Sequence, residues 1–438
     1  RSVSSTGEGG GEGGDTATSA HSRRSRRPAK ARDADSDSDS DAGDMAAAYH
    51  RAAALIGISG DRGSPVSKWF WPGDAPLQPP LDLDDNSSNI LARWGHADSL
   101  GVHAGRIPMA ILTRDLGDRR ANPYFDMDFY GDSGKSVFRP RYLIEELRSN
   151  PAFDYRAGMA VFQIDSKPGE RPCVHAVNTA TGAIEKFTAA RVVLCANALN
   201  SGRIVLNSLS LAKAQTTLLC NPYTYFPSVN LGMLGRPAGD RRHSLAQFGG
   251  VLLDDAGREI DGVFQMYSYR SLLLFKLVKE IPLPPSLGLL LARTLATSLS
   301  IFGIFFRDKM TEGKRMELVA GQPLEKPKLR FAHSFTPNEI AWKRACEARF
   351  RSALLRSHCV PIGQVDPGPA GSIHYAGTIP FTNPVNPHVR TLPDGTIAGL
   401  PNVFTGDSSS WSALPAKGLS FTLAANAIRV AELAAKSG

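Results

Sequence analysis

The chain has 438 residues, of which 42% are apolar and 21% are charged, and it contains 41 glycines and 30 prolines. A chain of this length can bury one large hydrophobic core or two. Its Gly and Pro content favours a loop-rich mixed α/β protein over a helical bundle. The formal net charge of +8 arises from scattered Lys and Arg rather than from a basic stripe between aromatic residues. This distribution argues against binding to nucleic acid.

The cysteines and the N-terminal residues exclude further classes of protein. The five cysteines lie far apart, are odd in number and form no Cys-x-x-Cys pair, which argues against a disulfide framework and a zinc ribbon. No metal site is expected. No apolar segment follows the N-terminal charges as in a signal peptide, so a cytoplasmic location and a membrane surface both stay open. Because the chain starts with Arg1 rather than Met, we expect its natural beginning to be missing.

The first 44 residues are of low complexity, with a Gly/Glu stretch, a basic cluster and an Asp/Ser alternation. With so few apolar residues, residues 1–44 cannot offset their ordering entropy and are predicted to be disordered. The first predicted helix covers 45–57 and ends at a glycine. Two more helices are predicted over 89–100 and 138–147.

A strand is expected over 153–165, followed by a hairpin with strands at 173–178 and 184–188. The apolar run 192–195 predicts a buried strand that leads into a helix ending near Ser208.

The most hydrophobic stretch of the chain is 270–306. Pro284 and Pro285 break it on one side and Arg293 lies inside the other, so a membrane-spanning helix is not expected. Two or three helices that are buried, or that rest on a membrane surface, fit this stretch better.

The last helix starts near Leu419, after which Leu423, Ala427, Val430 and Leu433 recur at helical spacing. Its free N–H groups and positive dipole end therefore point at whatever lies before residue 419.

Three ordered motifs lie between Gly371 and Ala434. His374 precedes a small-Gly-Thr step, a "Gly, apolar, Asn, apolar" strand follows at 399–403, and the turn Asp407-Ser408-Ser409 leads to the last helix. With the strand-to-helix junction at 192–203, where a sheet can cradle a dinucleotide, this pattern resembles the glucose-methanol-choline oxidoreductases. The likeness covers most of 46–210 and 360–435 and is weak between them.

The resemblance implies an α/β (α+β) fold: an N-terminally incomplete, Rossmann-like FAD-binding domain with an inserted, mostly antiparallel substrate-binding domain. The FAD-binding part would comprise 45–210, the substrate domain with its apolar helices 211–360, and the catalytic and FAD-binding C-terminal segment 361–438. FAD would be the cofactor and a small-molecule alcohol the substrate, while the electron acceptor stays open. The resemblance implies these cofactor-binding residues: Val161, Ala196, Asn197, Asp407, Ser408, Gly418 and Leu419.

The sequence also departs from the family's pattern. No Gly-x-Gly-x-x-Gly follows a strand before residue 150, although the family binds the FAD pyrophosphate with this loop. Asn197 stands where the family has Gly. The second catalytic position, usually His or Asn, falls on Lys417 or Gly418. Asp407 is expected either to contact the cofactor or to cap a turn with the serines that follow it.

His374 is the predicted catalytic residue, since a neutral imidazole with a pKa near 6.5 suits the removal of a hydroxyl proton. Lys417 lies at a helix N-terminus, where a cation is disfavoured unless an anion lies nearby. It is predicted either to stabilise negative charge at the flavin N1/C2 edge or to be an exposed loop lysine. His243, His358 and His388 lack the flanking pattern and are expected to be ordinary histidines.

Three functions remain open on the sequence alone. The first is an FAD-dependent oxidoreductase that oxidises the CH–OH group of an alcohol or polyol. The second is an inactive relative that acts as a binding protein, favoured by the missing loop, by Asn197 and by the change at Lys417/Gly418. The third is an enzyme for lipid or sterol-like alcohols that touches a membrane through 270–306.

Overall fold

The computed structural model describes residues 34–124, 131–211, 214–236, 243, 245–268, 283–319 and 321–436. The chain divides into two compact units, Arg1–Ala42 and Gly43–Gly438. The predicted disorder of 1–44 falls mainly on residues outside the described ranges. Within the described ranges, helix α1 (Ala34–Ile56) begins at Ala34 rather than at the predicted Met45, and it includes part of the Asp/Ser alternation.

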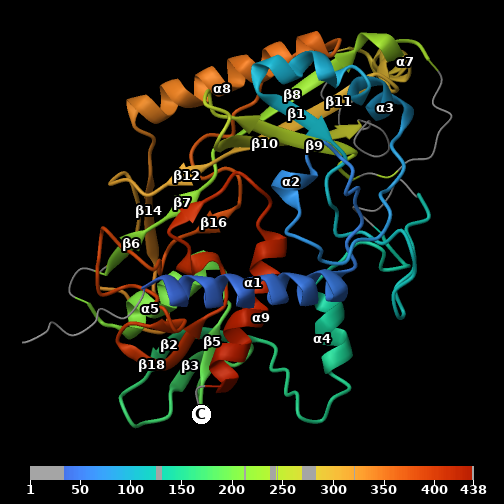
Figure 1. Cartoon of the computed structure of the whole chain (residues 1–438). Helices are drawn as coiled ribbons and strands as arrows, with labels where there is room; N and C mark the ends of the chain where they lie inside the picture. Colours follow the sequence, from blue (N-terminus) through green and yellow to red (C-terminus); the bar gives the residue numbers. More distant parts are fainter. Residues whose placement is uncertain are drawn as a thin grey trace, which may run out of the picture. The chain divides into compact units, whose positions relative to one another are not determined.

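The largest sheet has six strands in the order β1-β9-β10-β11-β8-β15, and every neighbouring pair is antiparallel (Figure 1). Most residues of β9, β10 and β11 are buried, so these central strands are covered on both faces along much of their length. The strands are β1 (Val102–Gly105), β8 (Tyr223–Asn230), β9 (Phe248–Leu253), β10 (Ile260–Ser268), β11 (Leu299–Phe306) and β15 (Cys359–Pro361).

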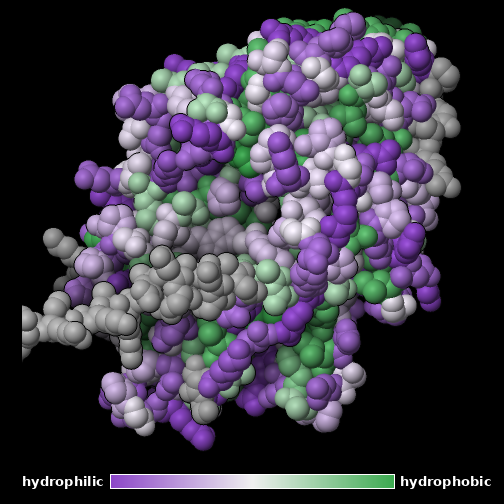
Figure 2. Space-filling model, viewed as in Figure 1, coloured by the Kyte–Doolittle hydropathy of each residue, from purple (hydrophilic) through white to green (hydrophobic). Residues whose placement is uncertain are grey.

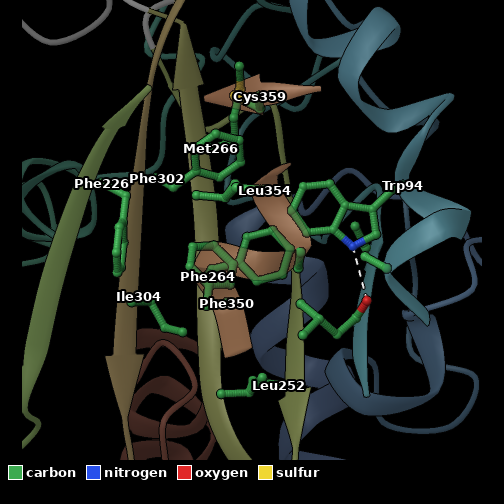
Figure 3. Packing of buried hydrophobic residues seen from close by; sticks show 14 of the residues in the cluster. Trp94, Phe226, Leu252, Phe264, Met266, Phe302, Ile304, Phe350, Leu354 and Cys359 are labelled. Carbon is green, nitrogen blue, oxygen red and sulfur yellow. Dashed lines mark hydrogen bonds between the residues drawn. The ribbon is translucent and has the colours of Figure 1, made fainter. Parts of the chain in front are cut away.

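One face of this sheet packs against helix α8 (Pro337–Arg356), α3 (Asp85–Leu91) and the 3-10 helix η1 (Trp94–Leu100). Figure 3 shows the aromatic core between them, where the Trp94 indole N–H donates to the Val102 carbonyl at 3.0 Å. A capping box at Thr336 and Glu339 starts α8. The core side chains labelled in Figure 3 include Phe226, Phe264, Phe302, Ile304 and Phe350.

A second group of elements surrounds β5 (Val192–Leu194) and β18 (Leu400–Thr405), the one parallel pair of strands in the described part of the chain. Figure 1 shows α9 (Ser420–Lys436) beside them. The remaining helices here are α4 (Arg141–Leu147) and α5 (Ala198–Ser208), and the strands are β2 (Met159–Asp165), β3 (Cys173–Asn178), β4 (Ile184–Thr188) and β17 (Thr396–Ile397).

Short strands connect the two regions. They form the pairs β7–β16 and β12–β19 and the sheet β14-β13-β6. Their bounds are β6 (Gln215–Thr217), β7 (Leu219–Cys220), β12 (Asp308–Lys309), β13 (Lys314–Leu318), β14 (Leu329–His333), β16 (Tyr375–Ala376) and β19 (Ala413–Leu414). The short helices are α2 (Ser67–Phe70), η2 (Leu231–Met233) and η3 (Ser408–Ser410). A longer helix, α7 (Pro285–Leu295), precedes β11.

The predicted hairpin 173–178/184–188 and the helices α5 and α9 are confirmed. The helix predicted over 89–100 is instead divided between α3 and η1.

The prediction of helices throughout 270–306 is wrong at its C-terminal end. Residues Leu299–Phe306 form β11, in which Phe302, Ile304 and Phe306 are fully buried on one face. An apolar run without polar alternation does not distinguish a buried helix from a strand, and here the β-branched and aromatic residues favour the strand. The helix prediction holds for α7, and 269–282 lie outside the described residues. Among the described helices, none has the length and hydropathy needed to cross a membrane.

Candidate functional site

His374 lies directly before β16, over the six-stranded sheet. Its ring stacks on Phe305 of β11, with the ring centroids 4.6 Å apart and the planes at 21°. Its Nδ1 atom is buried and has no hydrogen-bond partner among the described residues. Burial lowers the pKa of His374 below its usual value. The imidazole is therefore neutral near pH 7, and one of its ring nitrogens has no partner among the described residues.

Backbone hydrogen bonds of the following residue, Tyr375, help to hold His374 in place. Tyr375 of β16 pairs with Cys220 of β7, and the Ser408 hydroxyl donates to the Tyr375 carbonyl at 2.7 Å. Gly377 has a φ of 70°, and a Cβ there would lie 3.0 Å from the Trp411 carbonyl oxygen. The Gly of the small-Gly-Thr step is thus required by a left-handed backbone and a close approach. Ser408 therefore supports the strand that carries His374.

Lys417 lies in the loop before α9. Its side chain is half-buried, forms no ion pair or hydrogen bond with any described residue, and has its pKa lowered by burial. The Asn221 side-chain amide donates to the carbonyls of Phe306 and Pro415, at 2.6 and 3.1 Å. This bridge attaches the Lys417 loop to the end of β11, immediately after Phe305.

The register of the sheet places this loop and His374 on one face. One row of directly paired residues crosses four strands of the sheet: Val251 (β9), Val263 (β10), Phe305 (β11) and Tyr223 (β8). Residues paired in this way have their side chains on the same face of the sheet. Ala416 packs with Val251 and Val263 near one end of this row. His374 stacks on Phe305, one strand further along. Ala416, the neighbour of Lys417, thus packs on the strands next to the one that lies under His374.

Gly418 and Leu419 connect Lys417 to α9. Leu419 is buried with Leu219 and Ala376, the residues beside His374, whereas Gly418 is exposed and has no atom near its absent Cβ. Leu419 therefore packs beside the strand that follows His374, whereas Gly418 does not contact it.

Asp407, Ser201 and Ala196 form a second group, where β5 and β18 end. Asp407 Oδ2 accepts from the Ser201 hydroxyl at 2.5 Å, and the Ser201 oxygen accepts from the Ala196 N–H at 3.1 Å. Asp407 Oδ1 accepts from the Ser409 N–H at 2.9 Å and caps η3. The capping role expected for Asp407 is therefore present, and its role toward a cofactor stays a prediction.

Asn197 has φ 72° and ψ 146° and caps α5 by accepting from the Leu199 N–H at 3.3 Å. This backbone conformation is costly for any residue except glycine. Val161 lies on β2, where its carbonyl accepts from the Arg203 guanidinium at 2.9 Å. Ser408, next to Asp407, links this group to the residue after His374 through the Tyr375 carbonyl. The hydrogen bonds of Val161 and Asn197 given above do not reach His374.

The sequence analysis missed a buried charged cluster that supports the His374 strand. Asp308 Oδ2 accepts from the Cys220 N–H at 2.9 Å, and its Oδ1 accepts from Lys314 Nζ at 2.5 Å. Lys314 is fully buried and also pairs with Glu339. A cavity of about 410 Å³, lined in part by Asp308 and Glu339, borders this cluster and includes no predicted site residue. No sequence motif signals it, since its members come from separate elements.

No model of a protein family matches this chain, and no curated protein matches it. Solved structures do. Pyridoxine 4-oxidase from Mesorbium loti matches with a TM-score of 0.50 at 15% identity, covering 89% of this chain and 80% of that one. An FAD-dependent oxidoreductase from Chaetomium thermophilum matches with a TM-score of 0.50 at 14% identity, covering 83% and 75%. The chain is therefore a mixed helix and sheet protein similar in fold to FAD-dependent oxidoreductases.

The residues around His374 fit one end of a flavin. The buried Nδ1 of His374 lacks a partner, and the Lys417 ammonium at the start of α9 lacks an anion among the described residues. Both groups suit an electron-rich ring with hydrogen-bonding edges. For the pyrophosphate end, the described residues contain no glycine-rich loop between a strand and a helix.

Proposed function

We propose that this chain carries the catalytic part of a glucose-methanol-choline-type oxidoreductase, which oxidises the CH–OH group of an alcohol with FAD. The observation that carries the proposal is His374. Its neutral, half-buried ring, with an Nδ1 that has no hydrogen-bond partner among the described residues, suits the role of a general base. The fold similarity supports the proposal, because that fold holds FAD in the similar proteins named as FAD-dependent.

In this proposal, bound FAD supplies the acceptor for the hydride of the alcohol. His374 binds the substrate hydroxyl and takes up its proton, which its low pKa makes possible at neutral pH. Lys417 supplies positive charge beside the N1/C2 edge of the flavin, and the N-terminus of α9 adds to it. Phe305 orients the imidazole by stacking.

The proposed cofactor domain unites 45–210 with 361–438. The parallel pair β5–β18, with α5 and α9 beside it, would form part of a Rossmann-like sheet. Val161, Ala196, Asn197 and Asp407 would then lie along the cofactor. The proposed substrate domain, 211–360, supplies most of the six-stranded sheet.

The test begins with the visible spectrum of the purified chain, before and after the addition of FAD. Bands near roughly 370 and 450 nm that persist after gel filtration would show that the chain holds the cofactor. Alcohols are then screened for flavin reduction with His374→Ala, and with the exposed His388→Ala as the matched control. We expect only His374→Ala to lose reduction. A chain that neither retains nor takes up FAD would favour the non-enzymatic binding relative.

A second candidate is an enzyme that rests on a membrane surface to take up a lipid or sterol-like alcohol. It is favoured by exposed leucines at and before α7, and Figure 2 shows hydrophobic residues along the edge of the molecule where α7 lies. The exposed fractions are 45% for Leu283, 53% for Leu287, 41% for Leu289 and 63% for Leu290. Such a face can enter the interfacial layer of a bilayer.

Sedimentation with anionic liposomes tests this candidate. Leu287→Ser with Leu290→Ser should abolish co-sedimentation, while Leu355→Ser, at an equally exposed leucine of α8 (51%), should not. Equal partition of both variants would contradict the membrane role and leave the alcohol oxidoreductase proposal unaffected.

A further inference from the structure

Residues 366–373 form a strap that lies against α8 at its start and ends at His374. At the start, Asp366 Oδ2 accepts from Lys343 Nζ of α8 at 2.7 Å. At the end, Ser372 is buried, and its hydroxyl oxygen lies 3.2 Å from Cys220 Sγ of β7. The strap is therefore fixed at both ends, and its second end is the residue pair that precedes the predicted general base.

The backbone of the strap is strained between these ends. Ala370 has a φ of 61° and Ile373 has a φ of 60°. This left-handed conformation is uncommon for any residue except glycine, and it is an outlier for a β-branched side chain such as that of Ile. The Tyr375 hydroxyl donates to the Ala370 carbonyl at 3.1 Å and so helps to hold the strap in this conformation. Strained residues persist only where neighbouring contacts fix them, and they are typical of ligand clamps and switch regions.

Ile373 is unfavourably placed in a second way. Its exposed fraction is 76%, the largest among the large apolar side chains of the described residues. Ser372 on one side of it is buried, and His374 on the other side is half-buried. An apolar side chain gains free energy when it leaves water. Strain and exposure therefore both favour a second conformation, in which the φ of Ile373 is negative and its side chain is covered.

The part of the site that Ile373 can cover is His374 itself. A change of φ from positive to negative swings a side chain across the backbone while its neighbours stay in place. The Cα atom of the next residue, His374, is only about 3.8 Å away. Phe305 already covers one face of the imidazole, so the accessible part of this half-buried side chain is what a moving Ile373 meets.

The strap also has room to move, because its first half borders empty space. A cavity of about 410 Å³ lies between the first half of α8 and the strap residues Asp366, Gly368 and Pro369. A shift of the strap on this side requires less rearrangement than a shift against close-packed core side chains would.

We infer that the strap has an open and a closed position, and that Ile373 covers His374 in the closed one. The conformation described above is the open one, and the release of strain at Ile373 favours closure. A substrate bound at His374 would be shielded from water by the closed strap, as it is by the lids of other enzymes. The role of His374 rests on the proposed function, whereas the movement of the strap does not depend on it.

The test uses the free chain and diethyl pyrocarbonate, which acylates neutral imidazole nitrogens. The rate at which His374 is modified is measured by peptide mass spectrometry. Ile373→Asn accepts the left-handed conformation readily and loses the tendency to close, whereas Ile373→Val retains the β-branch and that tendency. We expect His374 to react roughly tenfold faster in Ile373→Asn than in the native chain, since strain at one left-handed residue corresponds to about this factor. Ile373→Val should react at about the native rate.

The comparison of Asn with Val separates movement from simple shielding, because the two side chains are of similar size. Ile373→Gly, which also accepts a positive φ, should react at least as fast as Ile373→Asn. The exposed His388 should react equally in all four proteins, and melting temperatures confirm that the variants are folded.

Equal rates for Ile373→Asn and Ile373→Val would overturn the inference, and so would a native rate in both Ile373→Asn and Ile373→Gly. The proposed function is judged separately, by flavin reduction with a set of alcohols. A chain that reduces no flavin but shows the expected order of rates would refute the oxidoreductase and leave the moving strap in place.

Discussion

Phe305 and His374 lie 69 positions apart in the sequence and stack face to face, with ring centroids 4.6 Å apart. The contact joins the central strand β11 to the segment that precedes β16. The contact shields one face of the imidazole from water, while the side chain as a whole is half-buried. The same contact explains why burial lowers the pKa of His374.

The stability of the protein should depend on His374 as the pH falls. Because its pKa is lower in the folded state, the unfolded chain binds more protons below about pH 6.5, and folding loses stability there. His374→Gln should therefore lose less free energy of unfolding than the native chain between pH 7 and the folded-state pKa. Urea titrations at a series of pH values measure this. If the free energy of unfolding fell equally with pH in both proteins, the burial of His374 would be contradicted.

Phe302 and Phe305 are two rings of one strand that face opposite sides of the sheet. Phe302→Ala removes a completely buried ring from the core and should cost about 3–5 kcal/mol in the free energy of unfolding. Phe305→Ala removes a half-buried ring and should cost about 1–2 kcal/mol. Chemical denaturation gives both values. If the two costs were equal, the open face beside His374 would be packed like the core.

Lys417 should lower the stability of the protein without ligand. Its charge is half-buried and unpaired among the described residues, so Lys417→Met should increase the free energy of unfolding at pH 7. The gain should vanish as the pH rises toward about 10.5, where the unfolded lysine also loses its proton. The exposed Lys436→Met, near the end of the same helix, is the control and should change little. A loss of stability in Lys417→Met would show that the ammonium has a partner.

Replacement of Asn197 by glycine should increase the stability of the protein. Its φ of 72° is strained for an L-residue, and Asn197→Gly should relieve about 1 kcal/mol while losing only a weak cap. Asn197→Ala retains the Cβ and loses the cap, so it should destabilise the protein. Melting temperatures of the three proteins rank them. An Asn197→Gly variant as unstable as Asn197→Ala would mean that the side chain, not the backbone, dominates at this position.

The loss of Lys314 from the buried cluster with Asp308 and Glu339 should strongly destabilise the protein. Lys314→Met leaves the carboxylates of Asp308 and Glu339 without their shared partner and should cost about 3–5 kcal/mol. The neighbouring Lys309 has an exposed side chain, and Lys309→Met should cost less than about 0.5 kcal/mol. Urea unfolding distinguishes them. Similar values for both variants would show that the acids are neutral or hydrated.

Local sequence patterns determined several elements and indicated one candidate site residue. The hairpin of β3 and β4 has a turn sequence between alternating strands, and α9 has a regular apolar stripe. The residues that give these signals lie close together in the chain, and the elements they specify are held by hydrogen bonds between near neighbours. The flanking pattern likewise singled out His374, since Gly377 is needed at a left-handed position three residues later.

Only the tertiary structure decided what surrounds His374. Whether 299–306 forms a helix or a strand depends on the neighbours β8 and β10, because an apolar run can satisfy either period. The row that joins Val251 to Tyr223 exists only once the register is set, and a shift of one residue would move Phe305 to the opposite face. The sequence by itself thus determined several local elements and pointed to His374 as a candidate. Pairing between distant strands decided which of them meet, since contacts between such strands have no local signature in the chain.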